Sequence, residues 1–547
     1  MSIISDTTKK AIKELVERSP ENEEQLAKIK REMAKKYRLS VLQNSTIFTG
    51  YRELVQQKKV ARNKDLERLL RKRQVRTLSG VAPVAVLTRP YPCPGECAYC
   101  PDEEEVPKSY LSNEPAVMRA IRNQYNPYTQ VQLRLKAMED NGHLPTKIEL
   151  IVIGGSWSVL PRKYKYWYIK ECFRAANEYP SSKVEGVDPR AIQESERELK
   201  RNNLKELRDK LHQEQKKNEK NRYGLIGITL ETRPDFIDDR EADQMREMGC
   251  TRVELGVQIV DDEVLEINKR GHGTAEIARA TRLLRDRGFK ITYHIMPGLP
   301  GSSYTKDVAA FEKLFVDDRF QPDQIKFYPT VVTQGSLLYR WWQEGKYTPY
   351  SDEQLKELIK ECKNIVPPYV RIIRLIRDIP EESIVAGNRI TNLRQLLQKE
   401  GMNCRCIRCR EAGNKRFGWE DVKLTTYEYT AADGKEYFLS YTSSDESVLY
   451  GFCRLRLPGK EAEGPSSLRE ASLIRELHVY GELVPAGDKE RKVQHAGVGR
   501  TLMTQAEEMA ASAGYKRMAV ISGIGVRGYY RKLGYQLKDT YMMKRTN

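Results

Sequence analysis

Three cysteines near the first quarter of the chain have a spacing that could support radical chemistry. Cys93, Cys97 and Cys100 form the pattern Cys-x3-Cys-x2-Cys within Tyr91–Pro101. Cysteine thiolates hold iron–sulfur clusters. Three thiolates on a [4Fe-4S] cluster leave one iron without a protein ligand, and that iron can chelate S-adenosyl-L-methionine as a source of radicals. The pattern therefore predicts an iron–sulfur centre with one open position.

Two other interpretations of these cysteines are weaker. A zinc site needs a fourth thiol or histidine close by, and the next cysteine along the chain is Cys172. A disulfide does not suit a chain whose N-terminus lacks the apolar core of a secretory signal. Clustered cysteines in a reducing compartment are usually metal sites, so the iron–sulfur interpretation is preferred.

A second cysteine cluster lies in the linker between two regions of different character. Cys404, Cys406 and Cys409 have the tight spacing Cys-x-Cys-x2-Cys, which suits a structural zinc with a distant fourth ligand. The sequence does not choose among the candidates for that ligand, which are Cys172, Cys362, Cys453 or a histidine. We therefore expect the linker 391–418 to bind zinc and to join two domains.

Glycines near the C-terminus predict a phosphate site. The residues concerned are Gln494, Gly497, Val498 and Gly499. Backbone N–H groups at a glycine-rich helix start bind phosphate, and after a strand this spacing indicates the pyrophosphate of coenzyme A. Tyr529 and Tyr530 follow a second glycine-rich turn, where a phenol could act on a thioester as an acid or hydrogen-bond donor. The alternative is that one tyrosine packs in the core while the other caps it.

Short apolar runs alternate with helical segments from Val81 onward, and these are the elements that must position the first cysteine cluster. Strands alternating with helices imply parallel strands joined by right-handed crossovers. About six such units predict a partial α/β barrel, in which chemistry is located at the carboxyl ends of the strands. The runs are 81–87, 148–153, 225–230, 252–257, 289–295 and 324–328.

Residues at the carboxyl ends of these runs are therefore candidates for cofactor binding. Gly154 and Gly155 would let a ligand approach the backbone closely, which suits the ammonium and carboxylate of an amino acid. The other candidates are Glu231, Arg233, Gln258 and His294. Each is a weak signal alone, but together they follow one cysteine cluster in the chain.

Length and charge indicate a multidomain protein with an anionic partner. The chain has 547 residues and a net charge of +18, which allows two to four domains and favours nucleic acid as a partner. Lysine and arginine concentrate in residues 57–76, where they could contact backbone phosphates or form a solvated helix face. Residues 7–37 predict two helices, and alternation beyond residue 418 predicts antiparallel strands. No stretch has the apolar length of a membrane span, so a soluble, cytoplasmic protein is expected.

Several motifs resemble the family of the catalytic subunit of Elongator over essentially the whole chain. They include the cysteine triad, the Gly154-Gly155 pair and the stretches Glu231–Asp235, Arg374–Pro380, Glu476–Gly481 and Tyr529–Lys532. A radical S-adenosylmethionine (SAM) domain placed before an acetyltransferase-like domain is typical of that family. The resemblance implies an α/β fold, with a partial (β/α)6 radical SAM barrel followed by a GNAT-type α+β acetyltransferase-like domain.

The resemblance also implies domain boundaries and an activity. It implies a helical, basic, tRNA-binding region over 1–78, the radical SAM domain over 79–390, the cysteine-rich linker over 391–418 and the acetyltransferase-like domain over 419–547. The family forms 5-carboxymethyluridine at the wobble position of the tRNA anticodon, with acetyl-CoA as substrate. Lys147 would contact acetyl-CoA at the radical centre, and Glu476, Leu477, His478 and Val479 would contact the coenzyme.

The spacing of the first triad and the presence of the second one resemble archaeal or bacterial members. Such an enzyme would use an external electron donor and act without the other Elongator subunits, with a homodimer possible. Two rival classes remain open. A protein lysine acetyltransferase of the histone type would use only 494–499 and a tyrosine, and a non-catalytic tRNA-binding scaffold would use neither the glycines nor the first triad.

Overall fold

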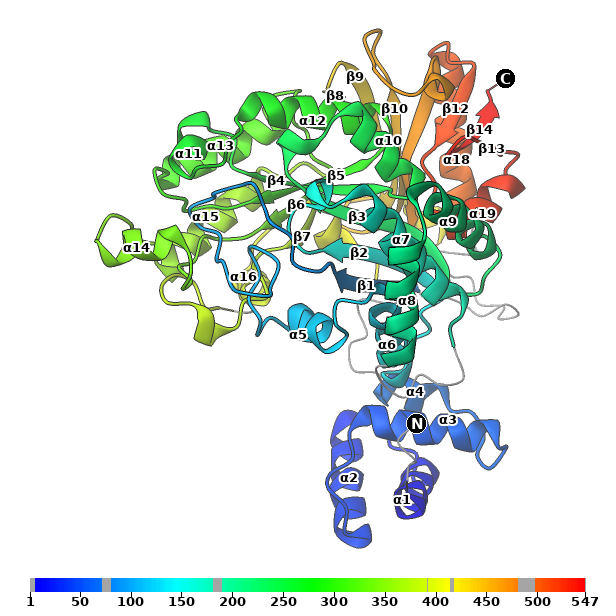
Figure 1. Ribbon diagram of the computed structural model, residues 1–547. Helices are drawn as coiled ribbons and strands as arrows, with labels where there is room; N and C mark the ends of the chain where they lie inside the picture. Colours follow the sequence, from blue (N-terminus) through cyan, green and yellow to red (C-terminus); the bar gives the residue numbers. More distant parts are fainter. Residues whose placement is uncertain are drawn as a thin grey trace.

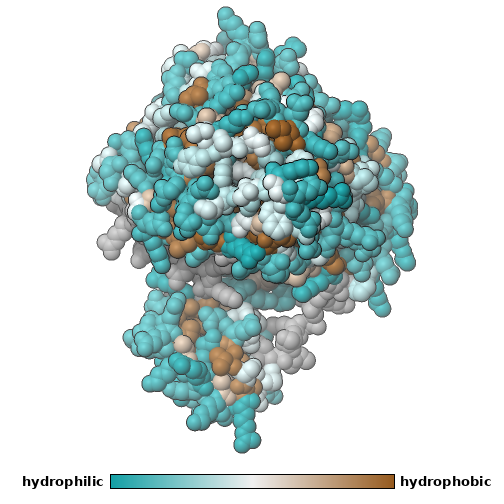
Figure 2. All heavy atoms as spheres, turned by 90° about the vertical axis from the view of Figure 1, so that its left-hand side faces the viewer, coloured by the Kyte–Doolittle hydropathy of each residue, from teal (hydrophilic) through white to brown (hydrophobic). Residues whose placement is uncertain are grey.

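The computed structural model describes residues 5–70, 80–180, 189–390, 392–413, 418–480 and 497–546. Two seven-stranded sheets form the main body, and a group of N-terminal helices stands apart from it (Figure 1). Figure 2 shows this group as a separate lobe below the main body, with hydrophilic side chains over most of the face in view. Within the described residues, no helix is long and apolar enough to cross a membrane.

The N-terminal lobe consists of four helices around a small core of its own. The helices are α1 (Asp6–Glu17), α2 (Glu23–Tyr37), α3 (Asn44–Gln56) and α4 (Lys64–Leu70). Their apolar residues recur at helical spacing, and Ile12, Met33 and Tyr51 are among those buried together. The prediction of two helices over 7–37 is confirmed. Residues 71–79, which hold part of the basic stretch 57–76, lie outside the described residues.

The first sheet contains parallel strands in sequential order from β1 to β7. The strands are β1 (Val81–Leu87), β2 (Lys147–Ile153), β3 (Gly224–Thr232), β4 (Arg252–Gln258), β5 (Lys290–Ile295), β6 (Gln324–Phe327) and β7 (Arg371–Arg374). The predicted partial barrel is confirmed, with one strand more than the six expected. The additional strand is β7, which the sequence does not reveal because two isoleucines between arginines do not form an apolar run.

Helices connect the strands of this sheet, and several of them pack on its outer face. They include α5 (Pro115–Arg122), α6 (Pro127–Asp140), α7 (Arg162–Asn177), α10 (Asp239–Glu247), α11 (Asp262–Ile267), α12 (Thr274–Asp286), α13 (Tyr304–Val316), α14 (Leu337–Gln343), α15 (Asp352–Asn364), α16 (Leu393–Lys399) and α17 (Ile407–Arg410). α8 (Pro189–Arg201) and α9 (Leu204–Asn218) belong to a highly charged segment of the chain. α9 nevertheless packs against the core, where Leu207 and Leu211 are fully buried.

Each strand of the first sheet sends alternate residues to opposite faces. In β1, Ala82, Val84 and Val86 are buried, whereas Val81, Pro83 and Ala85 line a cavity on the inner face. The inner residues become polar from β3 to β6, since Glu231, Glu254, His294 and Lys326 line the same cavity. The outer residues therefore build the hydrophobic core, and the inner residues build a chamber that is polar on the side of β3 to β6.

The second sheet is mixed and has the order β13-β14-β12-β11-β10-β9-β8. Its strands are β8 (Val422–Ala431), β9 (Gly434–Ser443), β10 (Leu449–Leu457), β11 (Ala471–Val479), β12 (Arg517–Val520), β13 (Gln536–Lys538) and β14 (Tyr541–Arg545), with helices α18 (Val498–Ser512) and α19 (Arg527–Lys532). The predicted antiparallel strands are confirmed by β9, β10 and β11. β11 pairs with β12 only through Ala471–Ile474, so the two strands separate beyond that point.

A buried network of ion pairs joins the amino ends of the first sheet to the second sheet. Asp323 immediately precedes β6, and its Oδ1 lies 2.5 Å from Arg475 Nη2 of β11 and 3.4 Å from Arg454 Nη1 of β10. Arg475 also pairs with Glu436 of β9 at 3.0 Å. These side chains are at most 1% exposed. The arginines hold the pKa of Asp323 well below its ordinary value, although burial alone would raise it.

We predict that Asp323→Asn strongly destabilises the joint between the two sheets. The substitution leaves Arg454 and Arg475 buried without their shared carboxylate, and breaking a buried pair in this way costs about 3–5 kcal/mol. Denaturant unfolding followed by circular dichroism measures the loss. The control is Asp317→Asn, which removes a pair with the exposed Arg319 and should cost less than about 1 kcal/mol. Equal small losses in both variants would contradict the structural importance of the network.

Candidate active site

The cysteine triad lies in the loop that follows β1, at the carboxyl end of the barrel. Cys93, Cys97 and Cys100 are free thiols that line a cavity of about 1160 Å³. The loop is held in place by Ala98, whose N–H donates to Asn268 O at 3.1 Å and whose carbonyl accepts from Leu338 N at 2.7 Å. This volume exceeds the usual 300–1,000 Å³ of a ligand pocket, so it can hold more than one ligand.

Two buried arginines approach the central cysteine. Arg270 Nη1 donates to Cys97 Sγ at 3.0 Å, and Arg233 Nη1 lies 3.7 Å from the same sulfur. Hydrogen bonding with Cys100 and the charges of these arginines lower the pKa of Cys97 to about 5. The thiolate is the form that binds metal. Arg233, predicted as a cofactor-binding residue, therefore contacts the cysteine loop directly.

The predicted glycine pair ends β2 beside this loop. Gly154 has φ +131°, and a Cβ there would lie 2.2 Å from Thr88 Oγ1. Gly155 has φ +88° and lines the cavity, where a Cβ would meet only Lys108 O at 3.6 Å. The first glycine thus allows the close packing of two strand ends, and the second leaves its backbone accessible to a ligand.

Gln258 ends β4 in a strained conformation next to the same loop. It is the last residue of the strand and has φ +71°, which is rare for a residue with a side chain and often marks functional sites. Its buried Oε1 has no hydrogen-bond partner among the described residues. A buried acceptor without a donor fits a ligand that carries hydroxyl or amino groups. Together with three thiols, the donor set fits a [4Fe-4S] cluster and SAM.

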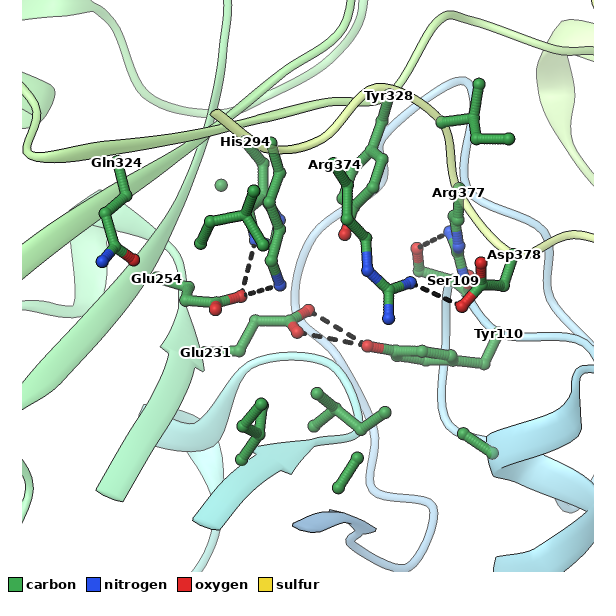
Figure 3. A pocket seen from close by; sticks show the side chains of 18 of the residues that line it. Ser109, Tyr110, Glu231, Glu254, His294, Gln324, Tyr328, Arg374, Arg377 and Asp378 are labelled. Carbon is green, nitrogen blue, oxygen red and sulfur yellow. Dashed lines mark hydrogen bonds and ion pairs between the residues drawn. The ribbon is translucent and has the colours of Figure 1, made fainter. Parts of the chain in front are cut away.

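Deeper in the barrel, four strands contribute a continuous polar cluster (Figure 3). Glu231 of β3 is in register with Glu254 of β4, and His294 of β5 is in register with Lys326 of β6. Glu254 Oε2 accepts from His294 Nε2 at 2.9 Å and also pairs with Lys326. Burial would raise the pKa of Glu254, but Lys326 and His294 hold it well below its ordinary value.

The rim of this cluster comes from loops after β1 and β7. Tyr110 Oη donates to the two carboxylate oxygens of Glu231 at 3.2 and 3.3 Å. Arg377 lies 4.8 Å from the Tyr110 ring, and Arg374 Nη1 donates to Asp378 Oδ2 at 2.6 Å. The sequence indicated Glu231 and His294 as site residues and gave Arg374–Pro380 only as a motif of the family resemblance, but it did not place Glu254, Lys326 or Tyr110 among the site residues. Only the alternation of side chains along each strand could have indicated Glu254 and Lys326.

Lys147 lies at the other end of the barrel from the cysteine loop. It is the first residue of β2 and pairs with Val81 and Gly224, the first residues of their strands. Seven-residue strands span about 20 Å, so about this length of β2 separates Lys147 from the cysteine loop. Burial lowers the pKa of Lys147. Contact with acetyl-CoA at this amino end stays a prediction.

The second sheet closes the amino end of the same cavity. Glu476, His478 and Tyr480, at the end of β11, line the cavity together with the cysteines. Glu476 Oε1 pairs with Lys290 Nζ of β5 at 3.0 Å. Burial lowers the pKa of His478 to about 4, which keeps the imidazole neutral near pH 7. The cavity therefore extends from the cysteine loop to β11.

The predicted coenzyme residues divide between the two faces of β11. Leu477 and Val479 face Gly499 at the start of α18, whereas Glu476 and His478 face the barrel. Gly497 caps α18 with φ +82°, and Val498 begins the helix. Gln494 lies outside the described residues.

The structure distinguishes the two C-terminal tyrosines. Tyr529 is 40% exposed, and its Oη lies 3.0 Å from where a Cβ on Gly499 would be. Tyr530 is 7% exposed and packs into the core. Burial raises the pKa of Tyr529, so the phenol remains protonated and can donate a hydrogen bond. Tyr529 is thus the tyrosine that faces the glycines at the start of α18.

The second cysteine cluster converges as a metal site would. The sulfurs of Cys404, Cys406 and Cys409 all lie within 4.8 Å of one another. Among the described residues, no other cysteine, histidine or carboxylate joins them, so Cys172, Cys362 and Cys453 are not a fourth ligand in this geometry. Lys363 Nζ lies 3.7 Å from Cys409 Sγ. The three thiols fit zinc, and its presence stays a prediction.

Comparison with known proteins identifies the family. Residues 91–314 match the family model described as Radical SAM superfamily, and residues 322–402 match the Radical_SAM C-terminal domain. The chain is 42% identical to "tRNA uridine(34) acetyltransferase" of Dehalococcoides mccartyi, over 86% of this chain and 99% of that protein. It is 35% identical to "Elongator complex protein 3" of Homo sapiens, over 97% of this chain and 95% of that protein.

This chain belongs to the tRNA uridine(34) acetyltransferase and Elongator complex protein 3 family. A solved structure, the archaeal Methanocaldococcus infernus Elp3 with an N-terminal deletion, matches with a TM-score of 0.70 and 36% identity. The match covers 85% of this chain and 99% of that one. The family and fold expected from the sequence are therefore confirmed.

We predict that Cys97→Ser abolishes stable cluster binding in this family member. With two protein thiolates left, a four-iron cluster should be labile, so anaerobic reconstitution should give far fewer than the about four irons per chain of the wild type. Iron counting and absorbance spectra measure this without relying on activity. Cys250→Ser is the matched control, because Cys250 is buried just before the amino end of β4 and donates to Arg252 O. Full iron content in Cys97→Ser would refute the cluster assignment.

We predict that Tyr529→Phe impairs tRNA-stimulated acetyl-CoA hydrolysis and that Tyr530→Phe does not. A positioned proton donor contributes about 10²–10⁴-fold to such a step, so hydrolysis by Tyr529→Phe should fall at least to the lower end of that range. Tyr530→Phe changes the same atom on the buried neighbour. Acetyl-CoA affinity, measured by calorimetry, should change much less than the hydrolysis rate in Tyr529→Phe and should stay at the wild-type value in Tyr530→Phe. If Tyr529→Phe keeps full hydrolysis, the exposed phenol has no chemical role.

Proposed function

We propose that this protein forms 5-carboxymethyluridine at the wobble position of tRNA, with acetyl-CoA as the source of the new carbons and SAM as the source of the radical. One observation carries the proposal. The residues that line a single cavity include the cysteine triad at one end and Glu476, His478 and Tyr480 of β11 at the other. The radical end of the barrel and the acetyltransferase-like sheet therefore share one cavity.

The names of the relatives support the substrate. "tRNA uridine(34) acetyltransferase" describes relatives from Dehalococcoides mccartyi and Methanocaldococcus jannaschii, which are 42% and 40% identical to this chain. The net charge of +18 suits an RNA partner, because lysine and arginine contacts supply most of the affinity for phosphates. The uridine must leave the stack of its loop to enter the barrel.

Each part of the cavity has a role in the proposed reaction. Cys93, Cys97 and Cys100 would hold the cluster, and Gly155 and Gln258 would bind SAM. When bound, this pair supplies a radical able to remove hydrogen from the acetyl methyl group. The residues of the barrel hold the reacting groups close together and exclude water. Gly497, Gly499 and Tyr529 would bind acetyl-CoA at α18.

Further parts of the proposal concern partners and cellular context. A reductant from another protein would supply the electron, and zinc would occupy Cys404, Cys406 and Cys409. A cytoplasmic location, action without the other Elongator subunits and a possible homodimer complete the proposal. The boundaries 78/79, 390/391 and 418/419 stay predictions, since each lies in or beside residues outside the described part.

A protein lysine acetyltransferase is the second candidate function. Its supporting observation is the start of α18, where Gly497, Gly499 and Tyr529 lie together as an acetyl-CoA site requires. That function leaves the cysteine triad and the barrel chamber without a role. A scaffold that only binds tRNA would leave both the cysteine triad and the start of α18 without a role.

Nucleoside mass spectrometry tests the proposed function. Anaerobic incubation of reconstituted protein with unmodified tRNA, SAM, acetyl-CoA and a chemical reductant should yield 5-carboxymethyluridine. Omission of SAM or of acetyl-CoA should remove the product. Carbon-13 in the acetyl group should appear in the nucleoside, because the acetyl methyl carbon joins the base. Acetylated lysine on protein substrates without modified tRNA would favour the second candidate instead.

A further inference from the structure

We propose that Glu231 selects uracil by accepting a hydrogen bond from its N3–H group, with Lys326 and Arg374 as donors to the two flanking carbonyls. The inference rests on the proposed function and names how the barrel recognises the base. Uracil presents an acceptor, a donor and an acceptor along its pairing edge, at O2, N3–H and O4. A complementary site must offer a donor, an acceptor and a donor, and unstacked RNA bases are recognised on this edge.

Glu231 is placed to be the central acceptor. It points into the cavity from β3, beside Tyr110 and Arg374 (Figure 3). Among the described residues its only hydrogen-bond partner is the neutral Tyr110 hydroxyl. An ionised carboxylate can accept about four hydrogen bonds. Glu231 therefore keeps lone pairs for a ligand, and Tyr110 fixes the plane of the carboxylate.

Donors lie on both sides of this carboxylate. On one side, Glu254 holds Lys326, and one ligand atom each of Glu231, Glu254 and His294 lies within 4.8 Å of the others. An ammonium has three N–H donors, and Glu254 is the one hydrogen-bond partner of Lys326 among the described residues. On the other side, Arg374 donates to Asp378 through Nη1 and lines the cavity with its remaining donors directed inward (Figure 3).

Glu254 and Glu231 have different roles: Glu254 positions its neighbours, whereas Glu231 is available to a ligand. Glu254 is fully buried and balanced by Lys326 and His294, so it positions these groups. Glu231 is partly exposed to the cavity and has no cation as a hydrogen-bond partner among the described residues. The three side chains could also suggest a metal site, but the Lys326 ammonium already supplies the positive charge beside Glu254. A neutral N–H donor suits the remaining position better than a second cation.

This arrangement excludes cytosine for a physical reason. Cytosine presents a lone pair at N3 and an amino donor at N4, so Glu231 would face a lone pair and Lys326 or Arg374 would face a donor. A hydrogen-bonding site rejects a ligand that leaves its buried groups unpaired. One well-placed contact of this type typically discriminates by about 10- to 100-fold.

The experiment varies both the nucleoside at position 34 of the tRNA and the Glu231 carboxylate of the protein. Full-length tRNA carrying uridine or 3-methyluridine at position 34 is given to the reconstituted protein, and kcat/KM is measured from the modified nucleoside. The methyl group removes the N3–H donor and leaves C5 free to react. For the wild type, 3-methyluridine should lower kcat/KM about 10- to 100-fold. Cytidine at position 34 should give no product.

In Glu231→Ala the ratio of the two kcat/KM values should fall towards one, because no acceptor remains to distinguish the substrates. Glu231→Gln, which keeps the volume and one acceptor, should give an intermediate ratio and guards against misfolding of the smaller variant. The matched control is Glu361→Ala, which removes a carboxylate that accepts from Tyr304 Oη at 2.7 Å on the surface. Its ratio should equal that of the wild type.

The outcomes separate this inference from the proposed function. If the wild type gives no 5-carboxymethyluridine from unmodified tRNA, the proposed function itself fails. If it gives product equally from uridine and 3-methyluridine, Glu231 does not recognise N3–H. A Glu231→Ala variant that keeps the wild-type ratio but loses SAM affinity would assign Glu231 to the cofactor and overturn the inference.

Discussion

The ion-pair network around Asp323 fixes how the two sheets of this protein meet. Asp323, Glu436, Arg454 and Arg475 are removed from water, and the desolvation of each charge is offset only when its partners are in place. Arg475 Nη1 also donates to Phe289 O, just before β5. The network therefore permits one arrangement of the second sheet beneath the barrel.

That arrangement creates the shared cavity. Arg475 is held against the amino end of the barrel, and the β-bulge at this residue lets the following Glu476 face the barrel as well. Glu476 and His478 therefore line the chamber. The opposite face of β11 presents Leu477 and Val479 to the start of α18. β11 thus contacts both the proposed coenzyme site and the barrel. The packing of the two sheets therefore sets the distance between these two sites.

The sequence predicted the parts of the site that depend on local pattern. Cysteine spacing, the Gly154-Gly155 pair and the alternation of strands and helices indicated the cluster loop and the partial barrel correctly. It could not indicate what depends on register between distant strands. Lys326 is a lysine in a four-residue strand, and only its register with His294 brings it to Glu254. The position of Lys147 was also hard to predict. Its closeness to a strand in the sequence does not indicate at which end of the barrel the residue lies.

The charge balance inside the barrel separates supporting residues from those that meet a ligand. At the amino end Glu149 pairs with Arg252 at 2.8 Å and Glu476 pairs with Lys290, so these carboxylates are already compensated. Glu254 is compensated in the same way. Glu231 has a neutral hydroxyl as its partner and faces the cavity. A carboxylate that is hydrogen-bonded to no cation keeps lone pairs without a partner, and a ligand with a hydrogen-bond donor can satisfy them. The carboxylate with free lone pairs therefore lies where we propose that the base is recognised.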